Sequence, residues 1–144
     1  MTSTSATRGR TSALATETLV LESDQDVVRA RHLVRQLSLD AGLRLIDQTK
    51  LVTAVSELAR NTVVHGGGGR MSAGLLEQGG RSGVWALFED DGPGISDIDQ
   101  ALRQGFTTGD GLGLGLGGAK RLVHEFSARS APGEGTAVRV VSWR

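Results

Sequence analysis

Glu57 and Asn61 are the first pair of side chains that could carry out chemistry, because they stand four residues apart in a segment with an apolar stripe. In a helix this spacing places the two side chains beside each other, about one turn apart. A carboxylate next to an amide oxygen can take a proton from an attacking hydroxyl and help to hold a hydrated divalent cation. Glutamate and asparagine are also common on solvated helix surfaces, so the spacing alone leaves an ordinary surface as the alternative.

The carboxylate of Asp90 is a second candidate, since it directly follows the most apolar run of the chain, residues 84–88. A carboxylate at the end of a buried strand lies at the mouth of the core, where it can accept a hydrogen bond from a donor such as an exocyclic amine. Gly92 and Gly94 come next, and glycines let a flat ligand approach the backbone. The same Asp-Gly-Pro-Gly residues are common turn formers, so a simple turn is the alternative here.

A third candidate is the run at residues 109–118, where glycine alternates with leucine ahead of a helix-like segment that carries Lys120. The backbone N–H groups of such a loop, with the positive end of a helix, can cradle phosphate groups. Gly113, Gly115 and Gly118 match G-x-G-x-x-G, but no strand precedes them and too few residues follow for a dinucleotide-binding fold. The run also lacks the Walker A ending and comes too late for the glycine loop of a protein kinase. A flexible low-complexity loop remains as the alternative.

The elements that must position these residues follow an irregular order. Glycines 79–80 predict a hairpin, Gly66 should end a helix in the usual way, and residues 84–88 indicate a central strand covered on both faces. We expect strands at 16–22, 70–78, 82–90, from 128, and 136–143, and helices at 24–42, 45–65, 97–104 and 117–126. This order predicts an α+β sandwich, with one mostly antiparallel mixed sheet and helices on one face.

The composition narrows the function classes. The chain has 144 residues, a formal net charge of +0 and no cysteine, which argues against a nucleic-acid surface, a disulfide framework and a cysteine-bound metal. It has no apolar run long enough to cross a membrane, and from the composition of residues 1–12 we expect no secretory signal. We expect a solvated tail at residues 1–15 and one cytoplasmic domain at 16–144.

Taken in order, four short motifs resemble those of the GHKL nucleotide-binding superfamily, which includes gyrase-like ATPases, Hsp90 and the catalytic domains of histidine kinases. The ExxxN and DxGxG boxes of that superfamily fall on Glu57 with Asn61 and on Asp90 with Gly92 and Gly94. Its glycine-rich lid box and its final Gly-x-Gly-Thr box fall on Gly111, Gly113 and Gly115, and on Gly133, Gly135 and Thr136. Four ordered matches over most of the chain are more specific than any one of them.

Within the superfamily the chain is similar to the RsbT-type switch-protein serine kinases of bacterial partner-switching systems. The similarity covers roughly residues 16–144 and includes the SELARN motif at 56–61, GPGI-S-DI at 92–98, the lid entry at 105–108, residues 111–122, and a tryptophan and an arginine at the C-terminus. We expect no histidine kinase, which needs a helical hairpin with a phosphoaccepting histidine, and no gyrase-like or Hsp90-like protein, which carries further large domains.

The resemblance implies a Bergerat-type fold that binds ATP and Mg²⁺ and transfers phosphate to a serine or threonine of a STAS-domain antagonist, in a stress or developmental switch. It implies that Asp90 binds the adenine amine with the help of Thr136, that Asn61 holds Mg²⁺, and that Glu57 orients and deprotonates the acceptor hydroxyl. The backbone at 111–118, which includes Leu116, would wrap the phosphates, with Lys120 placed to help.

Two other functions stay open at this point. An RsbW-type anti-sigma-factor kinase would share the chemistry and also bind a sigma factor, and the motifs do not separate the two, although ELARN and the lid sequence favour the RsbT type. A non-catalytic, ATP-dependent binding module would instead activate a PP2C-type phosphatase by contact. The intact Glu57 argues against a catalytically inactive protein.

Overall fold

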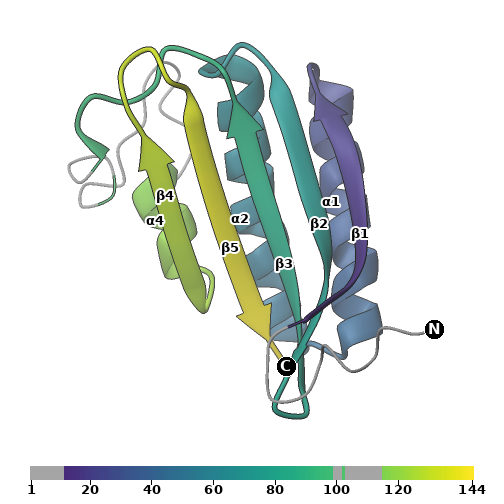
Figure 1. Ribbon diagram of the computed structural model, residues 1–144. Coiled ribbons are helices and arrows are strands. Elements are labelled where there is room, and N and C mark those ends of the chain that lie inside the picture. The colour runs from purple at the N-terminus through teal and green to yellow at the C-terminus, as the bar shows by residue number, and fades with distance from the viewer. Residues whose placement is uncertain (1–11, 99–101, 103–114) are drawn as a thin grey trace.

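A computed structural model describes residues 12–98, 102 and 115–144, and places one five-stranded sheet against a layer of helices (Figure 1). The strands lie in the order β1-β2-β3-β5-β4, and each pairing between neighbours is antiparallel. The strands are β1 (Ser12–Leu21), β2 (Gly69–Gln78), β3 (Arg81–Asp90), β4 (Glu125–Ser130) and β5 (Thr136–Trp143). The expected α+β sandwich is confirmed, with an antiparallel rather than a mixed sheet in the part that the structure describes.

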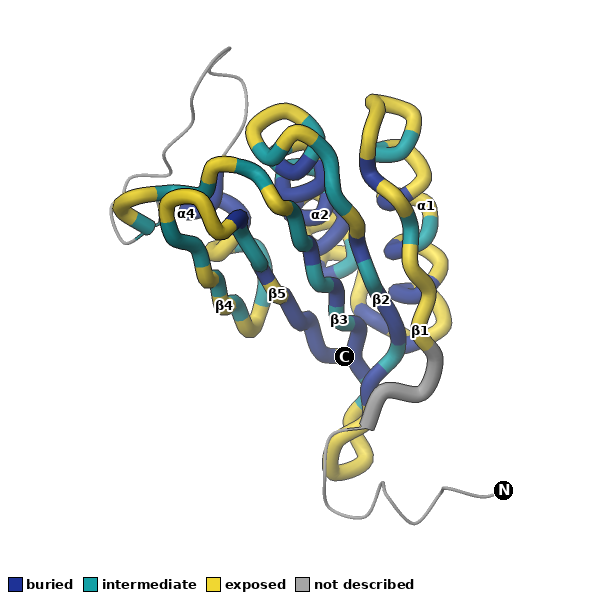
Figure 2. Tube along the Cα trace, turned by 45° about the horizontal axis from the view of Figure 1, so that its top comes forward, coloured by how far each residue is buried: buried dark blue, intermediate teal, exposed yellow. Residues whose placement is uncertain are grey.

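The described helices, α1 (Asp24–Ala41), α2 (Leu45–Val64) and α4 (Gly115–Arg121), pack on the same face of the sheet (Figure 1). None of them is long and apolar enough to span a bilayer. In Figure 2 the exposed residues gather on the edge strand β1 and on the outer side of α1, whereas the C-terminal half of β5 is buried. The helix expected at 97–104 and the tail expected at 1–15 lie largely outside the described residues, and β1 begins at Ser12.

Helix α1 begins where Asp26 collects hydrogen bonds from the backbone before it. Asp26 Oδ2 accepts the N–H of Glu22 at 2.9 Å and the N–H of Ser23 at 3.2 Å. The bond from Glu22 is the main reason why the pKa of Asp26 is lowered, followed by the bonds from Ser23 and the charge of Arg29. These contacts satisfy N–H groups that a helix start otherwise leaves without partners. The helix ends at Gly42, whose φ of 76° gives the left-handed cap that glycine favours.

Replacing Asp26 with asparagine should therefore lower the unfolding temperature at neutral pH. The folded pKa of Asp26 lies below the unfolded value, so its contribution is present above about pH 4 and is lost as the pH falls through the folded pKa. Thermal unfolding of the wild type and of Asp26→Asn between pH 3 and 7 should show two curves that converge in acid. Asp24→Asn is the control, because Asp24 lies in the same first turn but accepts none of these bonds.

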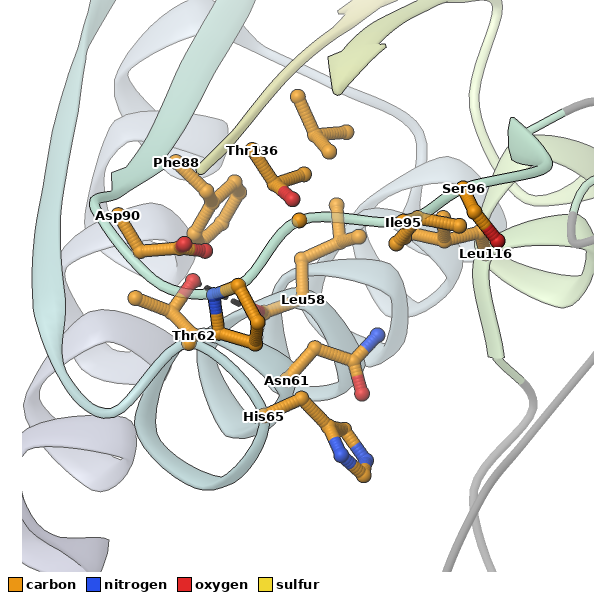
Figure 3. A pocket seen from close by; sticks show the side chains of 14 residues that line it. Leu58, Asn61, Thr62, His65, Phe88, Asp90, Ile95, Ser96, Leu116 and Thr136 are labelled. Carbon is orange, nitrogen blue, oxygen red and sulfur yellow. Dashed lines mark hydrogen bonds between the residues drawn. The ribbon is translucent and has the colours of Figure 1, made fainter. Parts of the chain in front are cut away.

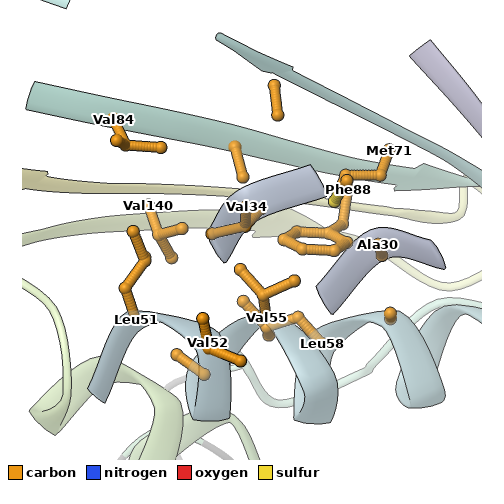
Figure 4. Packing of buried hydrophobic residues seen from close by; sticks show 14 of the residues in the cluster. Ala30, Val34, Leu51, Val52, Val55, Leu58, Met71, Val84, Phe88 and Val140 are labelled. Carbon is orange, nitrogen blue, oxygen red and sulfur yellow. The ribbon is translucent and has the colours of Figure 1, made fainter. Parts of the chain in front are cut away.

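Helix α2 supplies most of the core under the centre of the sheet. The predicted stripe of Leu51, Val55, Leu58 and Thr62 is buried, and Figure 4 shows its apolar members pointing at the strand side chains above. The end of α2 differs from the prediction, because Gly66 does not take the left-handed conformation. The N–H groups of His65 and Gly66 both bond to Asn61 O, at 2.9 and 3.0 Å. The left-handed turn comes one residue later, at Gly67, with a φ of 73°.

Strand β3 is central, as predicted, and it is joined to β2 through Gly79 and Gly80, whose φ values of 58° and 80° confirm the hairpin turn. The prediction that both faces of β3 are covered is wrong. Val84, Ala86 and Phe88 are buried under the helices, whereas Trp85 and Leu87 are half-buried on the opposite face. The described helices all lie on one face, and on the other face Trp85 packs in a small cluster with Leu76, Val141 and Trp143.

The C-terminal part also departs from the predicted boundaries. Helix α4 ends at Arg121, and β4 begins at Glu125, so the expected helix at 117–126 is too long and the strand expected from 128 starts too late. The reason lies in pairing: Glu125 and Phe126 stand opposite Val141 and Val140 of β5. A strand that adds a whole edge to the sheet outweighs the local helical preference of a short glycine-rich segment.

Candidate functional site

A cavity of about 380 Å³ opens beside the end of α2, between the end of β3 and the start of β5 (Figure 3). Its walls come from α2, β3, β5, the turn after β3 and the first residues of α4. The described lining residues are Leu58, Asn61, Thr62, His65, Gly66, Phe88, Asp90, Pro93, Gly94, Ile95, Ser96, Leu116, Thr136 and Val138. A mostly apolar cavity with a few polar groups is typical of a site for a small organic ligand.

Asp90 is the carboxylate of this cavity. It ends β3, where it stands opposite Gly69 of β2 on one side and Thr136 of β5 on the other. Its Oδ1 accepts the N–H of Gly92 at 2.9 Å. Within the described part of the chain Oδ2 accepts no hydrogen bond, so Asp90 keeps an acceptor for a ligand that carries an N–H or O–H donor.

The glycines after Asp90 are required by close contacts within the protein. Gly94 has a φ of 79°, and a Cβ there would lie 2.0 Å from Ala131 O. A Cβ at Gly92 would lie 2.6 Å from Gly66 O, and one at Gly135 would lie 2.1 Å from Asp90 O. Such distances leave no room for a side chain. The Asp-Gly-Pro-Gly segment is thus both a turn, as one interpretation has it, and one wall of the cavity, through Gly94.

Thr136 lies on the same wall as Asp90 and is held by Ser130, a residue that the sequence gives no reason to single out. Ser130 Oγ accepts the N–H of Ile95 at 2.8 Å and donates to Gly135 O at 2.9 Å. Its single proton is then used, so the 2.8 Å contact with Thr136 Oγ1 has Thr136 as the donor. The remaining lone pairs of Thr136 Oγ1 can accept a hydrogen bond from a ligand or a bridging water.

Along α2 the predicted residues Glu57 and Asn61 lie in a row with His65, which follows Asn61 at the same spacing of four residues. Asn61 and His65 line the cavity, whereas Glu57 is half-buried one turn earlier and is not among the lining residues. At about 1.5 Å per residue, Asn61 lies roughly 6 Å and Glu57 roughly 12 Å along the helix axis from His65. Since Gly66, which follows His65, lies against Asp90, Glu57 lies at the end of the row remote from Asp90.

The glycine run is only partly described. Gly111 and Gly113 lie outside the described residues, while Gly115 and Leu116 are buried at the start of α4 and Leu116 lines the cavity. Lys120 is exposed on α4 and is not among the lining residues. Among the described residues no three His, Asp or Glu side chains form a group that could hold a metal ion. A cation in this cavity would therefore need oxygen atoms of a bound ligand besides the Asn61 amide.

Apolar residues complete the site that the sequence motifs outline. Phe88 and Val138 come from facing positions of β3 and β5, and Leu58 comes from α2 beneath them. Ile95 and Leu116 close the opposite side (Figure 3). These residues also pack in or against the main hydrophobic cluster. In the sequence their apolar side chains therefore look like those of ordinary core residues. A flat aromatic ring could lie between these surfaces, with a polar group on its edge directed toward Asp90.

Comparison with known proteins gives concordant results. Residues 46–143 match the family described as histidine kinase-, DNA gyrase B- and HSP90-like ATPases. The chain is 41% identical to the serine/threonine-protein kinase RsbT of Bacillus subtilis (strain 168), over 84% of this chain and 91% of that protein. It is 26% identical to the anti-sigma F factors of Thermoanaerobacter sp. (strain X514) and Thermoanaerobacter pseudethanolicus, over 85% of this chain and 89% of each relative. The chain therefore belongs to the histidine kinase-, DNA gyrase B- and HSP90-like ATPase family.

Proposed function

We propose that this protein is an ATP-dependent serine/threonine protein kinase that phosphorylates a STAS-domain antagonist in a cytoplasmic partner-switching pathway of the stress or sigma-factor type. The observation that carries the proposal is the arrangement along one cavity of an acceptor carboxylate, Asp90, and a helix that bears Asn61 and then Glu57 at increasing distance from it. The 41% identity to a protein named a serine/threonine kinase supports the same activity.

The cavity fits the adenosine end of ATP. Its apolar lining includes Leu58, Phe88 and Val138, which can pack against a purine ring, and Asp90 Oδ2 is an acceptor at its edge. Adenine presents an exocyclic amine that such a carboxylate can bind, and Thr136 offers a second polar contact beside it. A hydrogen bond between a neutral donor and a charged acceptor contributes about 1.5–3 kcal/mol.

Asn61 is the residue that would hold Mg²⁺ against the phosphates. Mg²⁺ is commonly bound through one or two protein oxygens together with the phosphates of a nucleotide, so a lone amide on α2 suits this role. ATP supplies the phosphoryl group and Mg²⁺ neutralises its charge. The chain's own contribution is then to position the groups and to move one proton.

Glu57 would accept that proton from the serine or threonine hydroxyl of the partner. It is half-buried one turn from Asn61, on the side away from Asp90, where the acceptor must approach if the purine lies at Asp90. The hydroxyl proton would pass to the Glu57 carboxylate as the hydroxyl oxygen bonds to the γ-phosphorus of ATP. The bond from that phosphorus to the β–γ bridging oxygen would break in the same step, and ADP would leave. Positioning and charge neutralisation provide most of the catalysis in phosphoryl transfer, so few catalytic side chains are needed.

The direct test is a transfer assay with radiolabelled ATP. The purified chain is incubated with γ-³²P-ATP, Mg²⁺ and STAS-domain proteins encoded near its own gene, and the label should appear on a serine or threonine of one of them. The same partner with that residue changed to alanine should stay unlabelled. Tight ATP binding without transfer to any candidate partner would contradict the kinase and favour a binding module.

Replacing Asn61 with alanine should weaken both Mg-ATP binding and turnover, each by about tenfold, or ~1.4 kcal/mol. One residue serves both steps because a metal ligand acts on the bound nucleotide and on the reacting phosphate. Titration calorimetry with and without Mg²⁺ measures the first effect, and single-turnover transfer measures the second. Asn61→Asp keeps an oxygen at the same position and should retain Mg²⁺ dependence. An Ala variant with unchanged Mg²⁺ dependence would exclude Asn61 as the metal ligand.

An anti-sigma-factor kinase is the second candidate, and the two relatives named anti-sigma F factor support it. The two functions share the site and differ in the partner that the kinase retains. Gel filtration distinguishes the two functions. The chain is mixed with a sigma factor or with a PP2C-type phosphatase, each in the presence of ADP, and the column shows which complex forms. A stable complex with the phosphatase and none with the sigma factor supports the first proposal, and the reverse supports the second.

A further inference from the structure

Gly66 lies directly against the side chain of Asp90, at the point where α2 ends. A Cβ on Gly66 would lie 2.4 Å from Asp90 Cγ, 2.6 Å from Oδ2 and 2.7 Å from Cβ, and these are its three nearest atoms. Gly66 is not among the residues with a positive φ. The missing side chain at this position is therefore explained by the space that Asp90 occupies, and not by an unusual backbone conformation.

The peptide of Gly66 is enclosed from a second side and is anchored to α2. Gly92 approaches so closely that a Cβ there would lie 2.6 Å from Gly66 O and 2.8 Å from Gly66 Cα. The N–H of Gly66 is bonded to Asn61 O at 3.0 Å. Gly92 in turn donates its N–H to Asp90 Oδ1 at 2.9 Å. Gly66 and Gly92 thus form a seat that holds the Asp90 carboxylate.

This seat fixes which oxygen of Asp90 serves the cavity. Oδ1 is used by Gly92, and Oδ2 lies over Gly66 with no hydrogen-bond partner in the described part of the chain. Figure 3 shows the carboxylate pointing along the cavity wall above Thr62. A methyl group on Gly66 would force the Asp90 carboxylate to rotate, because the packed atoms around it leave no other space. The rotation would break the hydrogen bond from the Gly92 N–H or move Oδ2.

We propose that Gly66 is a positioning residue for ligand selection: it holds Asp90 so that Oδ2 accepts a hydrogen bond from the exocyclic amine of an adenine nucleotide. The inference rests on the proposed function. Gly66 also links Asn61 with Asp90 physically. Its N–H donates to the Asn61 carbonyl, and its Cα lies against the Asp90 side chain.

The test compares ADP with inosine diphosphate, whose base carries an exocyclic carbonyl oxygen in place of the exocyclic amine. Calorimetric titration of the wild type should show preference for ADP. Gly66→Ala should lose about tenfold in ADP affinity and little in inosine diphosphate affinity, because only the amine contact depends on Oδ2. Gly67→Asn is the matched control: a Cβ at Gly67 meets nothing within 4 Å, and asparagine tolerates its left-handed φ of 73°. This control should keep the wild-type preference.

An equal fall in both affinities would overturn the inference, because it would indicate general damage to the cavity. Unchanged ADP affinity in folded Gly66→Ala would overturn it as well. Failure of the wild type to bind ADP at all would instead reject the proposed function. The two failures are therefore distinguishable.

A second experiment covers the case in which Gly66→Ala is too unstable to titrate. Asp90→Gly removes all three atoms that a Cβ on Gly66 would meet. The double variant Gly66→Ala/Asp90→Gly should then unfold at the same denaturant concentration as Asp90→Gly alone, whereas Gly66→Ala alone is destabilised. Equal destabilisation by Gly66→Ala in both backgrounds would show that the two residues act independently, and would overturn the inference.

Discussion

Glu57→Gln should reduce phosphotransfer to the cognate partner by about 10²- to 10⁴-fold while leaving ATP affinity nearly unchanged. Glutamine has the size and helix propensity of glutamate, so the change removes the proton acceptor and keeps the shape of the side chain. Glu57 lies on α2 one turn before Asn61 and is not among the residues that line the cavity, which is why binding of the nucleotide should not depend on it. A single-turnover transfer assay with affinity measured in parallel separates the two effects.

Two comparisons make this result specific to the reaction. Glu77→Gln alters an exposed carboxylate on β2 in the same way and should transfer phosphate at the wild-type rate. Thermal unfolding of both variants checks that the helix is intact. Near-normal transfer by Glu57→Gln would exclude general-base catalysis by this residue, even if ATP binding were confirmed.

Much of the fold could be predicted because local signals agreed with the tertiary structure. The stripe of Leu51, Val55 and Leu58 predicts the buried side of α2, and the Gly79-Gly80 pair predicts the hairpin that sets the register of β2 and β3. The predictions are wrong where contacts with residues distant in the sequence determine the structure. The strand at Glu125 exists because β5 offers it an edge, and a run of apolar residues does not tell how many faces of β3 are covered.

The site divides in the same way. The motifs that resemble those of the GHKL superfamily indicate Asp90, Asn61 and Thr136, and the structure brings all of them to one cavity. The motifs do not indicate Ser130, because a serine at the end of a strand has no sequence signature of its own. Its role is seen only in its bonds to Ile95, Gly135 and Thr136. The sequence predicts Gly66 as a helix stop, whereas its position against Asp90 depends on a contact between segments that are distant in the sequence.

Asp90→Asn is the second substitution with a large expected effect, and it should reduce ADP affinity by roughly 10- to 150-fold, equivalent to about 1.5–3 kcal/mol. The bond from the Gly92 N–H requires an acceptor at the Oδ1 position, so the amide oxygen of asparagine will take that place. The NH₂ group then occupies the Oδ2 position and presents a donor to the exocyclic amine of adenine, which is also a donor.

The loss should therefore depend on the base. Inosine diphosphate carries an acceptor where adenine carries its amine, so Asp90→Asn should bind it at least as well as the wild type does, and the preference for ADP should narrow or reverse. Competition of each diphosphate against a fluorescent ADP analogue measures both affinities in one experiment. Asp91→Asn is the control, because Asp91 is the exposed neighbour and does not line the cavity. If Asp90→Asn weakened both nucleotides equally, Asp90 would support the cavity without reading the base, and adenine selection would have to come from another group.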